Sequence, residues 1–244
     1  MDERRPYQRL AVSRGAIDRA GRLLADRLMQ VPATLDRDVL DAMDVLIEYR
    51  DAHRAALEIT VGMLGQAVAG EGPVDAVGHR LKRTRRIVEK LGRFPAMALT
   101  SMQDIAGCRA VVPDLAAVAR ARERLTGTAG LEIVREHDYN ALPRESGYRA
   151  HHLIVRVART PVEIQLRTPW QQSWTDLVEQ LDSDYDVGLK HDGGPEVVRR
   201  YLASFAYAED RRYAGSPIAA VEKAALMALE SEAIAALKTR QARP

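Results

Sequence analysis

The sequence predicts an α+β fold, in which helices flank a mixed β-sheet and helical extensions stand at both ends. Two observations carry this prediction. Between Ile105 and Arg167, short segments typical of strands are separated by one helical segment and by turn-rich loops. Outside this region, apolar residues recur at steps of three and four residues, which is typical of amphipathic helices. Such a mixture favours a sheet that is covered by helices.

The N-terminal third is expected to be helical. Residues 13–29 form one amphipathic helix, and a second is expected from about Leu35 to Val68. Glycines and a proline in residues 69–73 then break the chain. The following basic stretch, residues 79–93, is expected to be helical to about residue 91.

The central region is expected to contain four strands and one helix. The strands are predicted at 109–112, 131–135, 152–157 and 162–167, and the helix at 115–125 with Asp114 as its N-cap. The last two strands form a hairpin around residues 158–161, and residues 138–149 form a loop. Three further helices are expected at 170–185, 196–212 and 217–238. We therefore predict a helical arm at 1–72, a catalytic domain at 73–190 and C-terminal helices at 191–244.

Composition excludes several classes of protein. Hydrophobic residues make up 46% and charged residues 29%, which is ordinary for a globular protein. No apolar run approaches the roughly 20 residues of a membrane helix, and the N-terminus lacks a signal peptide's apolar core. We expect a cytoplasmic protein with no membrane partner. The single cysteine, Cys108, excludes an internal disulfide, and no glycine-rich phosphate loop is present.

A candidate metal site involves two carboxylates. On the strand 162–167, Glu163, Gln165 and Arg167 alternate with apolar residues, so they share one face of the sheet. Asp104 stands just before the strand that contains Arg109. Two converging carboxylates suit Mg²⁺, which leaves its other positions to phosphate oxygens and water. Alternatively, the strand presents an ordinary solvated face and Asp104 caps a turn.

Basic and aromatic residues accompany these carboxylates. Residues 79–93 carry seven Lys or Arg and one Glu, which fits either a polyphosphate site or a solvated helix face. In the loop, Tyr148 offers a stacking face for a base, although a lone loop tyrosine is more often a surface anchor. His152 is likewise more often structural than catalytic.

Seven ordered motifs together resemble the RelA/SpoT synthetase domain. They are Arg80-x-Lys82, Lys90-Leu91-x-Arg93, Asp104-Ile-Ala-Gly-Cys-Arg109, Asp138-Tyr139 with Pro143, Gly147-Tyr-Arg-Ala-His-His152, Glu163-Ile-Gln-Leu-Arg-Thr168 and Trp174. The resemblance covers roughly residues 80–185. It implies a nucleotidyltransferase-like fold and an ATP-dependent pyrophosphokinase (diphosphotransferase) that transfers the β,γ-diphosphate of ATP to a ribose 3′-hydroxyl with the help of Mg²⁺.

The resemblance also implies a role for each matching residue. Asp104 and Glu163 would hold the metal, and Glu163 would activate the hydroxyl. Arg80 and Arg109 would sandwich adenine. The ATP phosphates would lie against Lys82, Lys90 and Arg93. The acceptor would bind to Tyr148, His152, Gln165 and Arg167.

The sequence leaves two candidate acceptors for the diphosphate. Small alarmone synthetases of this family use GDP or GTP and make ppGpp or pppGpp in the stringent response. The segments 13–21, 49–53 and 107–111 are similar to a single-domain branch that includes toxins of toxin–antitoxin pairs. This similarity slightly favours the 3′-terminal adenosine of tRNA as acceptor, and an antitoxin as a protein partner.

Two departures from the family pattern are notable. Residues 179–180 are Glu-Gln where alarmone synthetases usually have Glu-His, and Ala150 replaces the usual serine. A catalytically silent binding or regulatory module is a third reading, against which the presence of both Asp104 and Glu163 argues. The terminal helices would also suit a homo-oligomer.

Overall fold

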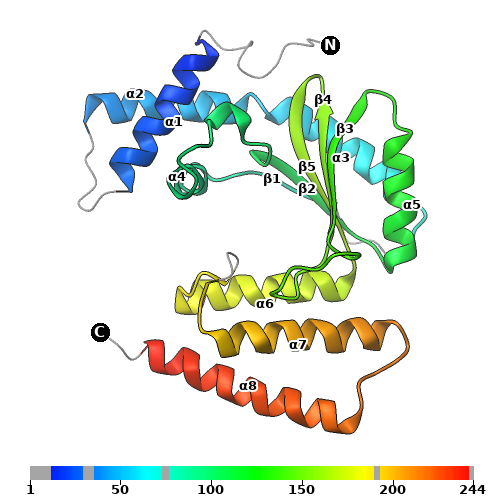
Figure 1. Cartoon of the computed structure of the whole chain (residues 1–244). Coiled ribbons are helices and arrows are strands. Elements are labelled where there is room, and N and C mark those ends of the chain that lie inside the picture. The colour runs from blue at the N-terminus through cyan, green and yellow to red at the C-terminus, as the bar shows by residue number, and fades with distance from the viewer. Residues whose placement is uncertain (1–11, 30–35, 73–76, 190–192, 242–244) are drawn as a thin grey trace. The chain divides into compact units, whose positions relative to one another are not determined.

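The computed structural model describes residues 12–29, 36–72, 77–189 and 193–241. Its helices are α1 (Arg14–Leu28), α2 (Arg37–Asp51), α3 (Arg54–Val68), α4 (Thr84–Arg93), α5 (Leu115–Thr126), α6 (Pro169–Tyr185), α7 (Glu196–Tyr213) and α8 (Ala220–Gln241). Its strands are β1 (Gly78–Leu81), β2 (Ala106–Val111), β3 (Leu131–Asp138), β4 (His151–Val157) and β5 (Thr160–Arg167), which form one sheet in the order β1-β2-β5-β4-β3 (Figure 1). The predicted α+β class is confirmed.

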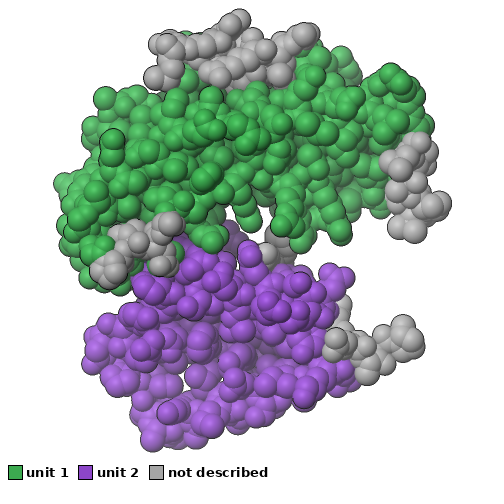
Figure 2. All heavy atoms as spheres, turned by 180° about the vertical axis from the view of Figure 1, so that it is seen from behind, with its two compact units in different colours: residues 1–137, 152–166 green, residues 138–151, 167–244 purple. Residues whose placement is uncertain are grey.

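The chain divides into two compact units (Figure 2). Unit 1 contains residues 1–137 and 152–166, and unit 2 contains residues 138–151 and 167–244. Unit 1 therefore holds α1 to α5 and most of the sheet, while unit 2 holds α6 to α8 and the loop before β4. The three-part division of the chain at residues 72 and 190 stays a prediction.

Two apolar cores stabilise unit 1. In the first, α3 and α5 cover one face of the sheet, where Val162, Ile164 and Leu166 are fully buried. These three residues alternate along β5, as the sequence predicts, because side chains on a strand point to opposite faces in turn. The second core joins α1, α2 and α4 around residues such as Ile17, Leu46 and Ile87. The opposite face of the sheet is thereby left to polar residues.

Unit 2 has a core of its own, formed by α6, α7 and α8. It contains Trp170, Trp174, Val198 and Leu202. The predicted helix 217–238 corresponds to α8, but of its described side chains only Ala233 and Leu237 are buried. Across the helices that the structure describes, none is long and apolar enough to cross a membrane.

The N-terminal region differs from the prediction in one respect. The single helix expected at 35–68 is two helices, α2 and α3, because the chain turns at Ala52 and His53. The His53 amide donates to Arg50 O instead of Tyr49 O, at 3.1 Å, and the His53 ring Nδ1 lies 2.9 Å from Tyr49 O. The carbonyl can only accept, so Nδ1 donates. The imidazole thus replaces a backbone donor and interrupts the helix.

The basic stretch 79–93 also differs from the prediction, because its first residues form β1 and only Thr84–Arg93 is helical. Strand β1 pairs with β2 in antiparallel register, with Gly78 opposite Arg109 and Arg80 opposite Gly107. Four residues with two exposed side chains give no alternation that sequence patterns detect. In the hairpin between β4 and β5, Ala158 and Arg159 have φ of 47° and 63°, which is typical of a type I′ turn.

Protonation of His53 is predicted to destabilise the fold. Burial lowers the pKa of His53 to about 4, despite hydrogen bonds that act in the opposite direction. The folded state holds the neutral form, so stability is lost as pH falls from 6.5 towards 4. Between pH 7 and pH 5 the loss in unfolding free energy is about 2 kcal/mol. Urea unfolding of wild type and His53→Asn at the two pH values measures it.

The His53→Asn variant keeps an amide donor near the Nδ1 position but has no titrating group, so its stability should change much less between the two pH values. The exposed His79 provides the control, since His79→Asn should behave as the wild type does. Equal pH dependence in His53→Asn and wild type would contradict this account.

Candidate active site

Three of the predicted site residues meet on the polar face of the sheet in unit 1. Glu163 and Gln165 lie on β5, and His152 lies beside them on β4. His152 Nδ1 lies 3.1 Å from Glu163 Oε1, and Gln165 Nε2 donates to Glu163 Oε2 at 2.8 Å. Both carboxylate oxygens are therefore held, and the Glu163 side chain is only 21% exposed.

Gly78 leaves room on this face for a charged side chain, since a Cβ there would lie 3.3 Å from Arg109 Cγ and Nε. Gly107 lies against Glu163 on the same face, where a Cβ would lie 3.9 Å from Glu163 Oε2, an ordinary contact distance. Arg80 stands opposite Gly107, two residues from Arg109 in the register, so the two arginines are diagonal neighbours on the same face. Arg80, Arg109 and Glu163 therefore share the polar face.

Asp104 lies just before β2, and two lysines donate hydrogen bonds to one of its carboxylate oxygens. Lys82 Nζ and Lys90 Nζ each donate to Asp104 Oδ2 at 2.8 Å. Lys82 follows β1, and Arg50 of α2 holds its carbonyl oxygen through a 2.8 Å hydrogen bond. Asp104 Oδ1 is buried and has no hydrogen-bond partner among the described residues. The structure thus brings together Asp104, Lys82 and Lys90 from three separate segments.

The electrostatics keep both carboxylates ionised. Burial raises the pKa of Asp104, but the ammonium groups of Lys82 and Lys90 outweigh it, and the pKa lies below its usual value. Burial also raises the pKa of Glu163, and the hydrogen bond and charge of His152 outweigh it in the same way. The negative charge of Asp104 acts to raise the pKa of Glu163, which indicates that the two carboxylates lie close enough to interact.

This donor set fits a hard divalent cation. Asp104 offers a buried carboxylate oxygen without a partner among the described residues, and Glu163 offers a second ionised carboxylate whose charge interacts with that of Asp104. Carboxylate oxygens are the ligands that such an ion requires from the protein. Within the described ranges, no group of three or more His, Cys, Asp or Glu side chains is placed to hold a metal. An ion bound here would complete its coordination with phosphate oxygens and water, as Mg²⁺ commonly does.

The remaining basic residues of α4 lie on its exposed side. Arg93 is exposed at the C-terminal end of this helix. Arg85 and Arg86 pair with Glu89 at 2.7 and 2.8 Å, so these two belong to a solvated helix face. The solvated-face interpretation thus applies to Arg85 and Arg86, whereas Lys82 and Lys90 pair with Asp104, and their role at a polyphosphate stays a prediction.

The other two predicted acceptor residues, Tyr148 and Arg167, lie in unit 2. Arg167 Nη2 donates to the Tyr148 hydroxyl at 3.0 Å, and Nη1 donates to Gln172 Oε1 at 3.0 Å. Arg167 is only 5% exposed, so it is not on the solvated face that the strand alternation predicts. It stands at the last residue of β5, where the chain enters α6, and packs within unit 2.

An aromatic cluster surrounds Tyr148. Its ring makes edge contacts with Tyr139 and Trp174, at centroid distances of 5.6 and 5.8 Å. The Arg144 guanidinium carbon lies 4.8 Å from the Tyr139 ring centroid and 5.5 Å from that of Tyr148. The sequence analysis does not identify Arg144 as a neighbour of Tyr148, because a single arginine in a loop belongs to no pattern. The available signal was its position between Tyr139 and Tyr148 in the sequence.

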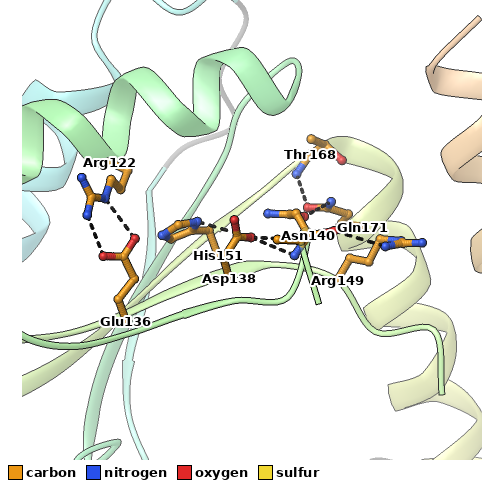
Figure 3. Close-up of polar contacts among 9 residues, drawn as sticks. Arg122, Glu136, Asp138, Asn140, Arg149, His151, Thr168 and Gln171 are labelled. Atoms are coloured by element: carbon orange, nitrogen blue, oxygen red, sulfur yellow. Dashed lines mark hydrogen bonds and ion pairs between the residues drawn. The ribbon is translucent and has the colours of Figure 1, made fainter. Parts of the chain in front are cut away.

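Polar contacts hold both ends of this loop (Figure 3). Gln171 Nε2 donates to Asn140 Oδ1 at 2.7 Å, and Gln171 Oε1 accepts from the Thr168 amide at 3.0 Å. His151 Nδ1 lies 3.6 Å from Asp138 Oδ1. The contacts of Gln171 thus hold the loop against the start of α6. Outside the loop, in unit 1, Arg122 makes two hydrogen bonds to Glu136 on β3.

Comparisons with known proteins identify the proteins that this chain resembles. Residues 79–186 match the family described as "Region found in RelA / SpoT proteins". The chain is 29% identical to GTP pyrophosphokinase YjbM of Bacillus subtilis over 181 residues, which cover 68% of this chain and 82% of the relative. It is 34% identical over 122 residues to the uncharacterized protein Rv1366 of Mycobacterium tuberculosis, covering 49% of this chain and 44% of the relative.

A solved structure is similar throughout most of its length. The small alarmone synthetase 1 of Bacillus subtilis, bound to its product pppGpp, is 27% identical and superposes with a TM-score of 0.58. The match covers 71% of this chain and 93% of that protein. The family resemblance that the sequence motifs predict is confirmed.

Asp104→Asn is predicted to weaken binding of a divalent cation. The amide keeps the size of the side chain and loses the charge that an ion bound at Oδ1 requires. Titration with Mn²⁺ in the presence of ATP, followed by calorimetry, should show binding weakened by more than about tenfold. Asp114→Asn, at the N-cap of α5, is the control and should bind as the wild type does. Unchanged binding by Asp104→Asn would show that the ion is held elsewhere.

Proposed function

We propose that this chain, whose residues 79–186 match the RelA/SpoT family, is an ATP-dependent pyrophosphokinase that transfers the β,γ-diphosphate of ATP to the 3′-hydroxyl of GDP or GTP. One observation carries the proposal above the others. Two ionised carboxylates have charges that interact: Glu163, on the face that also bears Arg80 and Arg109, and Asp104, which pairs with Lys82 and Lys90 just before β2. Diphosphate transfer requires this combination of anions for a metal and cations for a polyphosphate.

In the proposed reaction, the acceptor 3′-oxygen attacks the β-phosphorus of ATP. A new oxygen–phosphorus bond forms, the bond from the β-phosphorus to the α,β-bridging oxygen breaks, and AMP leaves. The hydroxyl proton passes to Glu163, whose lowered pKa leaves it ionised and able to accept. His152 and Gln165 each hold one oxygen of this carboxylate, so its orientation is fixed before the substrate arrives.

The proposed metal is Mg²⁺, held by Asp104 and Glu163. It would supply positive charge that neutralises the transferred phosphates and orients them for in-line attack. Lys82 and Lys90, which neutralise Asp104 in this structure, are close enough to the carboxylate to serve phosphate oxygens once that charge is shared with the ion. Arg93, at the end of α4, is assigned to the same polyphosphate by the family motif.

The nucleobases are assigned to arginine and tyrosine. Arg80 and Arg109 would hold adenine, since guanidinium planes stack on aromatic rings. Tyr148 would stack on the acceptor base, and Arg167 fixes the Tyr148 ring through its hydroxyl. This bond leaves the Tyr148 hydroxyl engaged, so the ring face is the part of this side chain that serves the base.

Two acceptors were open from the sequence, and the toxin-like segments slightly favour the 3′-terminal adenosine of tRNA. The comparisons instead favour a guanine nucleotide. The relatives with a stated activity are GTP pyrophosphokinases, and a similar structure holds pppGpp as product. A tRNA acceptor would also require a basic surface, and the N-terminal arginines are the candidates for it. Arg14, Arg19 and Arg22 are exposed on α1, while Arg4, Arg5 and Arg9 lie outside the described residues. An antitoxin partner belongs to this second reading alone.

The acceptor is tested with ATP labelled at the β-phosphate. GDP, GTP and deacylated tRNA are offered in separate reactions with Mg²⁺, and the products are separated by chromatography and by gel. We expect label in the guanine nucleotides. Label in tRNA alone would contradict the proposed acceptor and support the toxin-type reading, while transfer to none of the three would support a silent module.

Glu163→Gln is predicted to lower the rate of transfer by at least about 10²-fold, because the amide can neither accept the proton nor bind the metal as a carboxylate does. The amide has the same size, so the melting temperature should change little. Glu132→Gln, at an exposed glutamate on β3, is the control and should retain full activity. Activity in Glu163→Gln equal to that of the control would remove Glu163 from the mechanism.

A further inference from the structure

The loop that carries Tyr148 is packed against α7, a helix outside the family region at 79–186. Gly147, directly before Tyr148, has φ of 85° and lies against α7. A Cβ at this position would lie 2.7 Å from Ala206 Cβ, 3.0 Å from Ala203 Cα and 3.2 Å from Leu202 O. The backbone of the loop therefore touches the backbone of α7, and only glycine allows this approach.

An ion pair joins the other side of Tyr148 to the same helix. Arg149 Nη2 lies 3.4 Å from Asp210 Oδ2 on α7, and Arg149 is only 15% exposed. Arg149 Nη1 donates to Asn140 O at 3.4 Å, near the start of the loop. The guanidinium thus links α7 to both ends of the loop.

A third contact runs through Trp174. Its Nε1 donates to Leu202 O on α7 at 3.2 Å, and its ring supports the edge of the Tyr148 ring at 5.8 Å. Trp174 is 4% exposed, so its orientation is fixed by the core of unit 2. Contacts to α7 therefore fall on the residue before Tyr148, on the residue after it, and on the ring beside it.

We infer that α7 positions Tyr148 for the acceptor base, with Asp210 and Ala206 as positioning residues. The inference rests on the proposed role of Tyr148 in acceptor binding. Neither residue touches the substrate. Each holds the loop in one conformation, so that the tyrosine ring does not have to be ordered when the base binds, and the entropy cost of binding is lower. The acceptor site thus depends on a helix that lies outside the family region.

The first test compares Asp210→Asn with Glu209→Gln, a matched change at the neighbouring residue, whose carboxylate pairs with Arg212 within α7. Hydrogen–deuterium exchange of the peptide covering 139–149 should become faster in Asp210→Asn and stay unchanged in Glu209→Gln. The KM for GDP should rise about fivefold in Asp210→Asn, with the KM for ATP unchanged, as expected for a partly exposed ion pair that acts on one substrate only.

The second test restores the pair with its charges exchanged. The double variant Arg149→Glu with Asp210→Arg should exchange more slowly in the loop and have a lower KM for GDP than either single variant. Ala206→Leu, which adds volume where Gly147 packs, should also raise the KM for GDP selectively. If Ala206→Leu fails to fold, its melting curve shows this, and the Asp210 variants still decide the inference.

The exchange measurement separates this inference from the proposed function. Faster exchange of the loop in Asp210→Asn, together with no diphosphate transfer by the wild type, would support the contact of α7 with the loop and overturn the proposed function. Transfer by the wild type, together with unchanged exchange and an unchanged KM for GDP in Asp210→Asn, would overturn the inference. A parallel rise in the KM values for ATP and GDP would overturn it too, because that result indicates a general loss of structure.

Discussion

The structure of the site depends on the burial of two carboxylates that repel each other. Asp104 lies just before β2 and Glu163 lies on β5, and burial removes hydration from both, so each carboxylate requires its own compensation. Two ammonium groups compensate Asp104, and an imidazole and an amide compensate Glu163. The positions of these four partners explain much of the surrounding architecture. Lys82 must follow β1, α4 must present Lys90, and β4 must lie beside β5 to supply His152.

The sheet allows this arrangement because its two faces have different partners. Helices α3 and α5 cover one face with an apolar core, and this core fixes the register of β2, β4 and β5. Polar side chains on the opposite face then project from a rigid base. Gly78 on this face leaves room for the side chain of Arg109, which shares the face with Arg80 and Glu163. The packing of one face thus sets the geometry of the other.

The sequence predicts the strands that bury one face and most of the site residues on the other. Alternation along β5 placed Glu163 and Gln165 correctly on the polar face, because the apolar residues between them are fully buried. Arg167 follows the same alternation and still lies elsewhere, because the strand ends there and unit 2 begins. Alternation describes a strand and carries no information about what packs on its last residue.

Other features depend on tertiary contacts that local patterns do not contain. Strand β1 exists because it pairs with β2, and the break between α2 and α3 depends on an imidazole that replaces an amide at one carbonyl. The roles of individual site residues came from the family motifs and stay predictions until the variants are measured. The residues that hold the loop around Tyr148, such as Asn140 and Asp210, have no motif of their own, since their partners are distant in the sequence.

The connection between the two units has a practical consequence. Unit 2 contains the segment 138–151 and all residues after 166. The loop within 138–151 therefore packs against residues from the last third of the chain. A fragment cut at residue 186, the end of the family region, would lose α7 and uncover Trp174 and Val178 on α6. The region that matches the family is therefore not an excisable module, and chimaeras with its relatives should include the helices that follow it.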